Sequence, residues 1–230
     1  LLGAPLFAVI AAQALMGFTI SGLDPAIVAM EIASLSKSSV LVSLPLFVFA
    51  GEIMSRAGTS RRLMDLARSL VGSLPGGLGL VTVIVCAAFT ALTGASGVTI
   101  VALGGLLYPA LLREGFPRRY SVGLVTASGS LGLLFPPAIP IILYAVIARV
   151  PVEKMFLAGL IPGLLMVALF GLHAVATGKR RRLATQPFDK AELARALRAA
   201  AFELPLPLIV IGGVYTGFFA LSEAAAVIAG

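Results

Sequence analysis

Two short polar interruptions within long apolar runs carry the residue types best suited to chemistry in this sequence. The first, residues 93–97, reads Thr-Gly-Ala-Ser-Gly, and the second, residues 128–137, opens with Ser-Gly-Ser and closes with two prolines. Hydroxyls and backbone carbonyls released from a helix are oxygen ligands for cations, and the freed N–H groups suit anions. Both interruptions are therefore predicted to contact an ion or a small ligand.

Each interruption also has a plainer structural interpretation. Residues 93–97 would join two short, tilted membrane helices through a glycine turn. The prolines of the second region, Pro136, Pro137 and Pro140, would produce an ordinary kink that neighbouring helices accommodate. Three prolines within five positions nevertheless remove several backbone donors, so the helix over residues 121–148 is expected to unwind near its middle. Consecutive breaks of this kind are expected to meet at a similar depth in a bundle.

The composition excludes a soluble globular domain. Of 230 residues, 59% are hydrophobic and 12% are charged, against about 45–50% and about 25% in soluble domains. The formal net charge of +7 is interpreted as a record of orientation across a membrane rather than as a nucleic-acid surface. One cysteine and one histidine are too few for a disulfide framework or a zinc cluster.

Apolar runs predict several membrane spans, because a hydrocarbon core of ~30 Å needs about 20 helical residues. Residues 78–112 contain no Asp, Glu, Lys, Arg or His, and each half of about 16 residues would extend only ~24 Å as a helix. Because the small linker at 93–97 does not resemble a loop that reaches water, a re-entrant helical hairpin is predicted, with its open backbone facing protein or a water-filled cavity. The other runs are residues 1–20, 41–54, 121–148, 155–177 and 204–221.

The basic residues predict which loops share one side of the membrane. Cytoplasmic loops concentrate Lys and Arg, and of 17 such residues only Lys37, Arg149 and Lys154 fall outside three clusters. One cluster precedes residues 78–112, one follows them, and the third comes after two further spans. All three clusters are therefore predicted to be cytoplasmic.

Charged segments between the spans are predicted to form amphipathic surface helices. Residues 60–73 and 189–201 place leucines at helical spacing between charged residues. Glu52, at the end of an apolar run, is either an intramembrane carboxylate for proton relay or an ion-pair partner of Arg56, one helical turn later. The spacing favours the ion pair.

Several motifs follow one another in a recognisable order. They are PLFVFAGEIM at residues 45–54, LPGGLGL at 74–80, TGASGVTIVALGG at 93–105, GSLGLLFPPAIPIILY at 129–144, AGLIPGLL at 158–165 and LIVIGGVYTGFFALSEAAA at 208–226. Together they resemble the large membrane subunit of tripartite ATP-independent periplasmic (TRAP) transporters. The resemblance covers most of the chain, and several spaced motifs in one order are far more specific than any single motif.

This resemblance implies an all-α integral membrane protein, a polytopic helical bundle with a re-entrant helical hairpin and a broken transmembrane helix, corresponding to one of two inverted repeats. It implies a sodium-coupled secondary transporter of the bacterial inner membrane that works by an elevator motion and is not an enzyme. Sodium is the expected coupling ion, and no organic cofactor is expected. The expected partners are a periplasmic binding protein that delivers a small organic acid such as a dicarboxylate, a small membrane subunit, the C-terminal half of the large subunit and the lipid bilayer, without nucleic acid.

The resemblance also implies which residues hold cations and substrate. Backbone carbonyls and hydroxyls are expected to do so at Thr93, Gly94, Ser96, Gly97 and Thr99, and opposite them at Ser128, Gly129, Ser130, Gly132, Pro136 and Pro137. Sodium itself is expected at Gly94, Ser96, Gly129 and Ser130. Neither region contains Lys or Arg, so an anionic substrate would be held by dipoles, hydroxyls and bound cations.

The chain is expected to divide into four parts. Scaffold helices and an interfacial arm occupy residues 1–73, and the transport-domain hairpin (78–112) and broken helix (121–148) occupy residues 74–150. The next helix and a basic linker occupy residues 151–198, and the truncated start of a second repeat occupies residues 199–230. The sequence is thus expected to be the N-terminal half of a large subunit.

Three alternatives stay open on the sequence. Another elevator carrier, for dicarboxylates or arsenite, would work without a binding protein, and a membrane scaffold would use the hairpin only for packing. Residues 94–97 also fit the G-x-S-G pattern of rhomboid intramembrane serine proteases, in which a histidine base activates the serine. The single histidine, His173, is predicted near the cytoplasmic end of its span and Ser96 near mid-depth, which argues against a protease.

Overall fold

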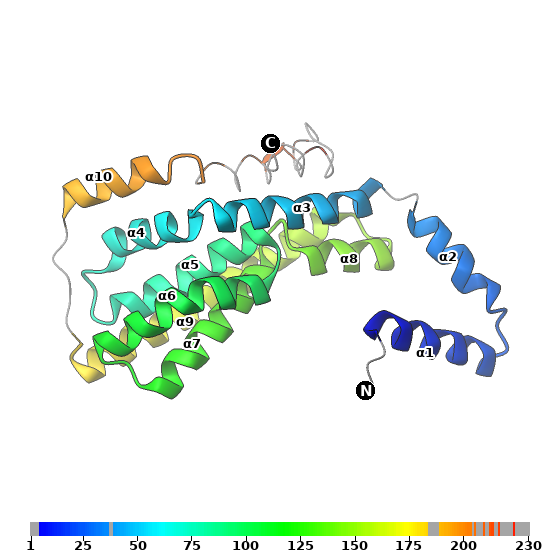
Figure 1. The fold of residues 1–230 in the computed structure, drawn as a ribbon, viewed down its shortest axis with the longest axis horizontal. Coiled ribbons are helices and arrows are strands. Elements are labelled where there is room, and N and C mark those ends of the chain that lie inside the picture. The colour runs from blue at the N-terminus through cyan, green and yellow to red at the C-terminus, as the bar shows by residue number, and fades with distance from the viewer. Residues whose placement is uncertain are drawn as a thin grey trace. The chain divides into compact units, whose positions relative to one another are not determined.

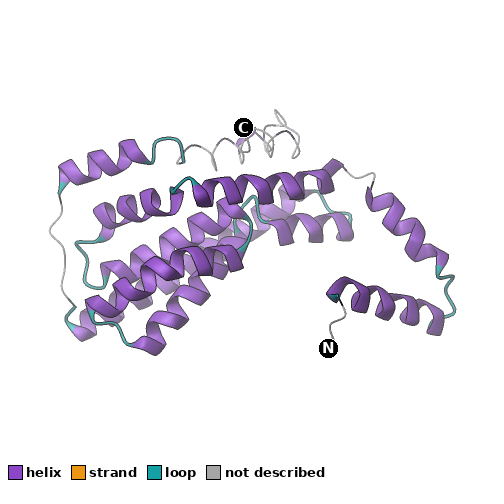
Figure 2. Cartoon of the chain, viewed as in Figure 1, coloured by secondary structure: helices purple, strands orange, loops and turns teal. Residues whose placement is uncertain are grey.

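A computed structural model describes residues 5–36, 39–183 and 189–203, together with residues 205, 209, 212, 213, 216 and 223. Within these residues the regular structure is helical, without a strand (Figure 2). This confirms the expectation of an all-helical chain. The chain divides into two compact units, residues 1–42 and 43–230, and each is described by itself.

The first unit contains the helices α1 (Leu6–Ile20) and α2 (Ala26–Ser36). α1 occupies most of the uncharged run at the start of the chain. No apolar run of spanning length predicts α2, which has 11 residues. Asp24 precedes α2 and satisfies one of its first N–H groups, because Asp24 Oδ1 accepts a hydrogen bond from Ala26 N at 2.8 Å.

The second unit holds the helices that carry both polar interruptions (Figure 1). α3 (Ser39–Arg56) crosses the division between the units. The elements that follow are α4 (Thr59–Val71), α5 (Gly77–Thr93), α6 (Ser96–Glu114), α7 (Arg118–Leu131), the 3₁₀ turn η1 (Gly132–Leu134), α8 (Ile139–Ala148), α9 (Val152–Arg181) and α10 (Lys190–Ala199).

Two of the described helices are long and apolar enough to cross a membrane by themselves, α6 with 19 residues and α9 with 30. The pair of segments Arg118–Leu134 and Ile139–Ala148 passes the same test together, with a bend of 43° between them. α1 and α5 are apolar but shorter. These lengths indicate a membrane protein, while the re-entrant form of the α5–α6 hairpin stays a prediction.

α5 is the central helix of the second unit and packs against α4, α6, α7 and α9. Its apolar residues are buried almost all round, with Val81, Val83 and Phe89 fully inaccessible to solvent. A helix that is apolar on every side is found either in a protein core or among lipids. The contacts of α5 with four helices place it in the protein core of this unit.

Glycines allow α5 and α9 to cross at backbone contact. A Cβ added to Gly178 would lie 2.2 Å from the Cα of Gly76, and a Cβ added to Gly79 would lie 3.0 Å from the Cβ of Ala174. Small residues at a helix crossing let two backbones approach closely, which is a common basis of association in membranes. Gly76 also has a φ of +73°, so it ends the turn after α4 in a conformation that L side chains rarely adopt.

α4 and α10 are the predicted amphipathic helices, and both are present. α4 buries Leu63 and Ala67 in the main apolar cluster of the unit, and Leu66 in a second cluster with Ala196 and Ala200. Protein therefore covers part of their apolar sides, while Leu70 of α4 and Leu197 of α10 stay exposed. Their location at a membrane surface stays a prediction.

The turns that follow α4 and α6 both lie beside the last part of α9. A Cβ on Gly115, in the turn after α6, would be 3.2 Å from Leu183 Cδ2, and Gly76, after α4, meets Gly178 of α9. That the basic loops share one side of a membrane stays a prediction.

Two sequence expectations fall largely outside the described residues. The apolar run at residues 204–221 and most of the expected start of a second repeat, residues 199–230, lie there. Lys37 also lies outside the described residues.

Candidate functional site

The first interruption forms a two-residue turn between α5 and α6. Gly94 has a left-handed φ of +66° and donates its N–H to the Thr90 carbonyl at 2.7 Å, and Ala95 is extended. A Cβ on Gly94 would lie 2.9 Å from Ile139 Cγ1. Gly94 is therefore required both by its φ and by the close approach of α8. The predicted helix break is confirmed, although Thr93, Ser96 and Gly97 remain helical.

The second interruption is a broken helix, as predicted. α7 tightens into η1, the residues after η1 are not helical, and α8 begins at Ile139. Gly132, the first residue of η1, lies on α5, because an added Cβ would be 2.4 Å from both the Ala87 carbonyl oxygen and the Thr90 Cβ. The break is therefore held against α5 by backbone contact.

A buried threonine connects the two breaks. Thr90 Oγ1 lies 2.8 Å from the Gly129 carbonyl oxygen of α7 and 2.7 Å from Thr99 Oγ1 of α6. Each hydroxyl has a single proton, so Thr90 donates to Gly129 and Thr99 donates to Thr90. This arrangement satisfies the two shortest contacts, and Thr90 and Thr99 are both fully buried.

Sequence reasoning identified Thr99 and Gly129 but missed Thr90. Thr90 lies inside the apolar helix α5, three residues before the polar interruption begins. A single threonine in an apolar helix commonly donates to a carbonyl of its own preceding turn, as Thr82 does to the Leu78 carbonyl at 2.8 Å. The position of Thr90 one turn before Gly94 was the only available signal.

Two predicted site residues present buried hydroxyls without a hydrogen-bond partner. Thr93 Oγ1 and Ser128 Oγ are both buried and unpaired, and the residues are 2% and 0% exposed. A buried hydroxyl without a partner costs about 1–3 kcal/mol. One lies at the end of α5 and the other in α7, next to Gly129. These two oxygens are available as ligands within the site.

The remaining predicted residues occupy different surroundings. Pro136 and Pro137 are buried, Ser96 is half-buried, and Gly97 and Ser130 are exposed. Ser130 Oγ donates to the Thr126 carbonyl of its own helix at 3.4 Å. The structure thus brings Thr90, Thr99, Gly129 and Gly132 into contact, from α5, α6, α7 and η1. The ligand roles expected for all eleven residues stay predictions.

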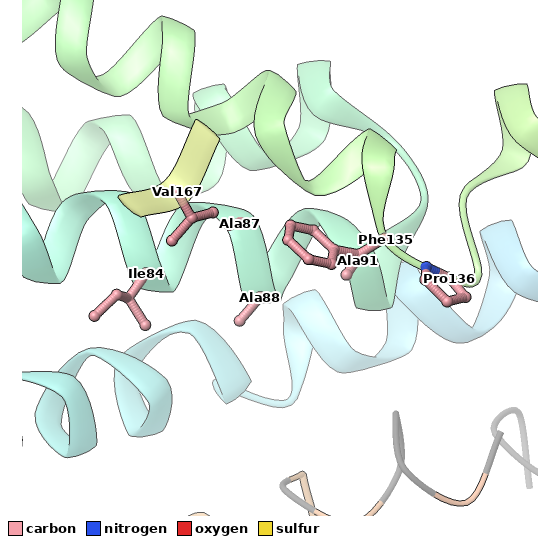
Figure 3. Close-up of a pocket in the computed structure, with 7 residues that line it drawn as sticks. All are labelled: Ile84, Ala87, Ala88, Ala91, Phe135, Pro136 and Val167. Atoms are coloured by element: carbon pink, nitrogen blue, oxygen red, sulfur yellow. The ribbon is translucent and has the colours of Figure 1, made fainter. Parts of the chain in front are cut away.

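An apolar pocket of about 270 Å³ lies beside the break. Figure 3 shows Ala87, Ala88 and Ala91 on α5 together with Phe135 and Pro136 of the broken segment. Ile84 and Val167 complete the lining, which contains no charged side chain. This pocket suits hydrocarbon rather than a cation or a carboxylate, so it is not the site expected for either.

Glu52 is the charged residue next to the first break, because it follows Gly51, whose added Cβ would lie 2.7 Å from the Thr93 Cα. Glu52 and Arg56 form the predicted ion pair at 2.7 Å, with both side chains substantially exposed. His173 contacts Tyr120, with ring centroids 5.7 Å apart. Among the described residues, no group of three or more His, Cys, Asp or Glu side chains could hold a metal ion. A cation at the breaks would therefore depend on hydroxyl and carbonyl oxygens.

The sequence matches a known family over its whole length. Residues 1–230 match the tripartite ATP-independent periplasmic transporter, DctM component. The chain belongs to the DctM family. This confirms the resemblance to TRAP large subunits, and DctM proteins are transporter permease subunits rather than enzymes.

Relatives in this family carry different substrate names. The chain is 36% identical to the C4-dicarboxylate TRAP transporter large permease protein DctM of Rhodobacter capsulatus, over 91% of this chain and 51% of that protein. It is 35% identical to the ectoine/5-hydroxyectoine large permease protein UehC of Ruegeria pomeroyi, over 98% of this chain and 54% of that protein. It is 34% identical to the 2,3-diketo-L-gulonate large permease protein YiaN of Escherichia coli, over 99% and 54%. This DctM-family chain thus spans about half the length of the relatives it matches.

Proposed function

We propose that this chain is the N-terminal part of the large permease subunit of a sodium-coupled secondary transporter. The transporter imports small organic acids across the bacterial inner membrane, with a periplasmic binding protein delivering the substrate. A small membrane subunit and the C-terminal half of the large subunit complete the permease. Family membership over residues 1–230 supports the permease assignment.

The observation that carries the cation site is the junction of the two helix breaks. Gly94 of the hairpin lies against Ile139 after the broken segment, and Thr90 bonds the Gly129 carbonyl. Thr93 Oγ1, at the end of α5, and Ser128 Oγ, next to Gly129 in α7, are both buried without hydrogen-bond partners. Sodium is a hard cation that takes oxygen ligands, and broken transporter helices supply such ligands at their open ends. The DctM chain would thus contribute some of the ligands of a cation site. The C-terminal half of the large subunit would contribute the others.

The length of α5 supports a re-entrant hairpin within this permease, although α6, its other arm, is long and apolar enough to cross a membrane. α5 has 17 residues and α9 has 30, which correspond to ~25 Å and ~45 Å. A helix of ~25 Å is shorter than a hydrocarbon core of ~30 Å. An elevator motion would carry the hairpin and the broken helix together against a scaffold.

The substrate is proposed as an organic anion without a direct basic partner in this half. The turn at Gly94 and Ala95 and the segment from Ser128 to Ala138 contain no Lys or Arg. An anion here would be held by N–H groups, hydroxyls and the bound cations. The relatives' names, which include dicarboxylates and a diketo acid derivative, agree with this class.

The geometry does not favour the serine-protease alternative. Ser96 begins α6, whereas His173 contacts Tyr120, which lies in α7 just after the opposite end of α6. The 19 residues of α6 correspond to ~28 Å. A general base must lie within hydrogen-bond reach of its serine, and His173 does not.

The test is sodium-dependent uptake by the reconstituted full-length permease with its binding protein. Thr93→Val and Ser128→Ala each remove an unpartnered buried hydroxyl, and each is expected to raise the half-saturating sodium concentration at least about tenfold, since a ligand to a charged group contributes about 1.5–3 kcal/mol. Thr126→Val is the matched control, because its hydroxyl is exposed and donates to the Val122 carbonyl at 2.7 Å. Unchanged sodium dependence in both site variants would exclude this site. Uptake without the binding protein would instead indicate the alternative function, an elevator carrier for dicarboxylates or arsenite that works without a binding protein.

A further inference from the structure

Arg62 of α4 and Glu203, which follows α10, form an ion pair across 141 residues of sequence. Arg62 Nε and Nη2 both approach Glu203 Oε1. Thr59 Oγ1 lies 3.4 Å from the same oxygen and 3.3 Å from Arg62 Nη2. Glu203 is only 6% exposed. These three residues, Thr59, Arg62 and Glu203, are named the α4 clasp.

The turn that precedes α4 fixes the clasp from its own side. Arg62 Nη1 donates to the Ala57 carbonyl at 3.0 Å, in the turn between α3 and α4. The guanidinium therefore presents its remaining donors to Glu203 from a position set by the backbone. A planar guanidinium held in this way gives orientation as well as attraction.

An apolar contact lies one helical turn from the clasp on α4. Leu66 packs with Ala196 and Ala200 of the α10 segment, and Leu193 covers their edge. Two contacts at different heights on one helix fix rotation as well as position. α10 is itself capped, since Asp189 Oδ1 accepts a hydrogen bond from Ala191 N at 2.8 Å.

α4 has α5 on its other side. Leu63 and Ala67 belong to the apolar cluster that contains Leu78 and Val81 of α5. α4 thus lies between α10 and α5, as Figure 1 also shows. α10 and α5 thus contact opposite sides of the same helix.

We propose that the α4 clasp is a positioning cluster that docks residues 189–203 on α4 and thereby sets the placement of α5, the helix that ends at the hairpin turn. The expected effect on uptake rests on the proposed transport function. The docking of residues 189–203 on α4 does not depend on that function. The chemistry is an ion pair between the buried Glu203 carboxylate and the partly exposed Arg62 guanidinium, completed by a threonine hydroxyl. Loss of the Arg62 charge leaves the Glu203 carboxylate without compensation in a buried position.

Docking is measured by thiol cross-linking in membranes that contain the full-length permease. Leu66→Cys and Ala196→Cys are introduced in a Cys86→Ala background, and the rate of cross-linking by a short bifunctional thiol reagent is followed. Glu203→Gln is expected to lower this rate about tenfold, in line with measured couplings between contacting residues. Arg61→Gln, which removes an exposed cation next to Arg62, is expected to leave the rate unchanged.

A double-mutant cycle separates the pair from two independent effects. The double variant carries both Arg62→Gln and Glu203→Gln. If the two residues act together, the double variant cross-links no more slowly than the single variant with the larger effect. The same variants are then tested for sodium-dependent uptake, where kcat is expected to fall with KM for the organic acid unchanged. If the pair acted only in folding, the variants would yield less active protein, and kcat per active molecule would not vary with the cross-linking rate.

Three results would overturn the inference in separate ways. An unchanged cross-linking rate in Glu203→Gln, or losses that add in the double variant, would show that the clasp does not dock α10. Slow cross-linking with full uptake per molecule would show that docking does not position α5. If the unmodified permease shows no sodium-dependent uptake, the proposed function fails, and the cross-linking rates still decide the docking.

Discussion

Replacing Gly132 by alanine tests whether the broken segment is held on α5 by backbone contact. Gly132 has a right-handed φ of −63°, so alanine introduces no backbone strain and regains about 0.5–1 kcal/mol relative to glycine. The added Cβ would nevertheless lie 2.4 Å from the Ala87 carbonyl oxygen and from the Thr90 Cβ. Overpacking costs about 1–3 kcal/mol, and a helix backbone yields less than a side-chain tip. The expected net destabilisation is about 1–2 kcal/mol.

The same substitution should also alter the sodium dependence of uptake. The Thr90 Cβ that meets the new methyl group carries the hydroxyl bonded to the Gly129 carbonyl at 2.8 Å. A displaced Thr90 would lengthen that bond and shift Gly129, next to the unpartnered Ser128. We therefore expect a higher half-saturating sodium concentration together with the loss of stability.

The assay is thermal unfolding of the purified permease in detergent, followed by uptake after reconstitution. Gly123→Ala is the matched control in α7, because no atom lies within 4 Å of its added Cβ and alanine favours a helix by up to about 1 kcal/mol. A Gly132→Ala permease that unfolds at the same temperature as the Gly123→Ala control, or higher, would refute the backbone contact.

Three further substitutions have defined outcomes. Gly178→Ala places a Cβ 2.2 Å from the Gly76 Cα and is expected to abolish stable assembly, as measured by the yield of monodisperse protein, whereas Gly105→Ala, with no atom within 4 Å of its Cβ, should not. Thr90→Val leaves the Gly129 carbonyl without its donor and should cost about 1–3 kcal/mol in thermal unfolding, while Thr90→Ser should retain most of that stability. Glu52→Gln should change stability by less than about 1 kcal/mol, because its pair with Arg56 is exposed, and should leave uptake unaltered, since a proton-relay role would instead abolish it.

The helix breaks were predictable because their causes are local. Gly94 ends α5 through its own φ, and Pro136 and Pro137 end the helical segment by removing backbone donors. The Glu52–Arg56 pair was predictable for the same reason, since four residues place both side chains on one helix face. Such features depend on a few residues that are neighbours in the chain, so the sequence is sufficient to predict them.

The connections between distant elements were not predictable. The bond from Thr90 to Gly129 depends on how α5 and α7 pack, and nothing in the apolar pattern of α5 distinguishes Thr90 from Thr82. The pair of Arg62 and Glu203 joins residues 141 positions apart, and each alone resembles an ordinary surface charge. α2, with 11 residues, is shorter than the spans that hydropathy identifies.

The glycine contacts of α9 restrict how the permease is able to move. Near one end of α9, Gly178 touches Gly76 at the start of the hairpin, and toward the other end a Cβ on Gly159 would lie 2.6 Å from the Leu134 carbonyl oxygen of the broken segment. These contacts are made by main-chain atoms, which have no rotamers with which to absorb a displacement. A movement that separated α9 from the hairpin or from the broken segment would therefore have to break close main-chain packing at one of these two places.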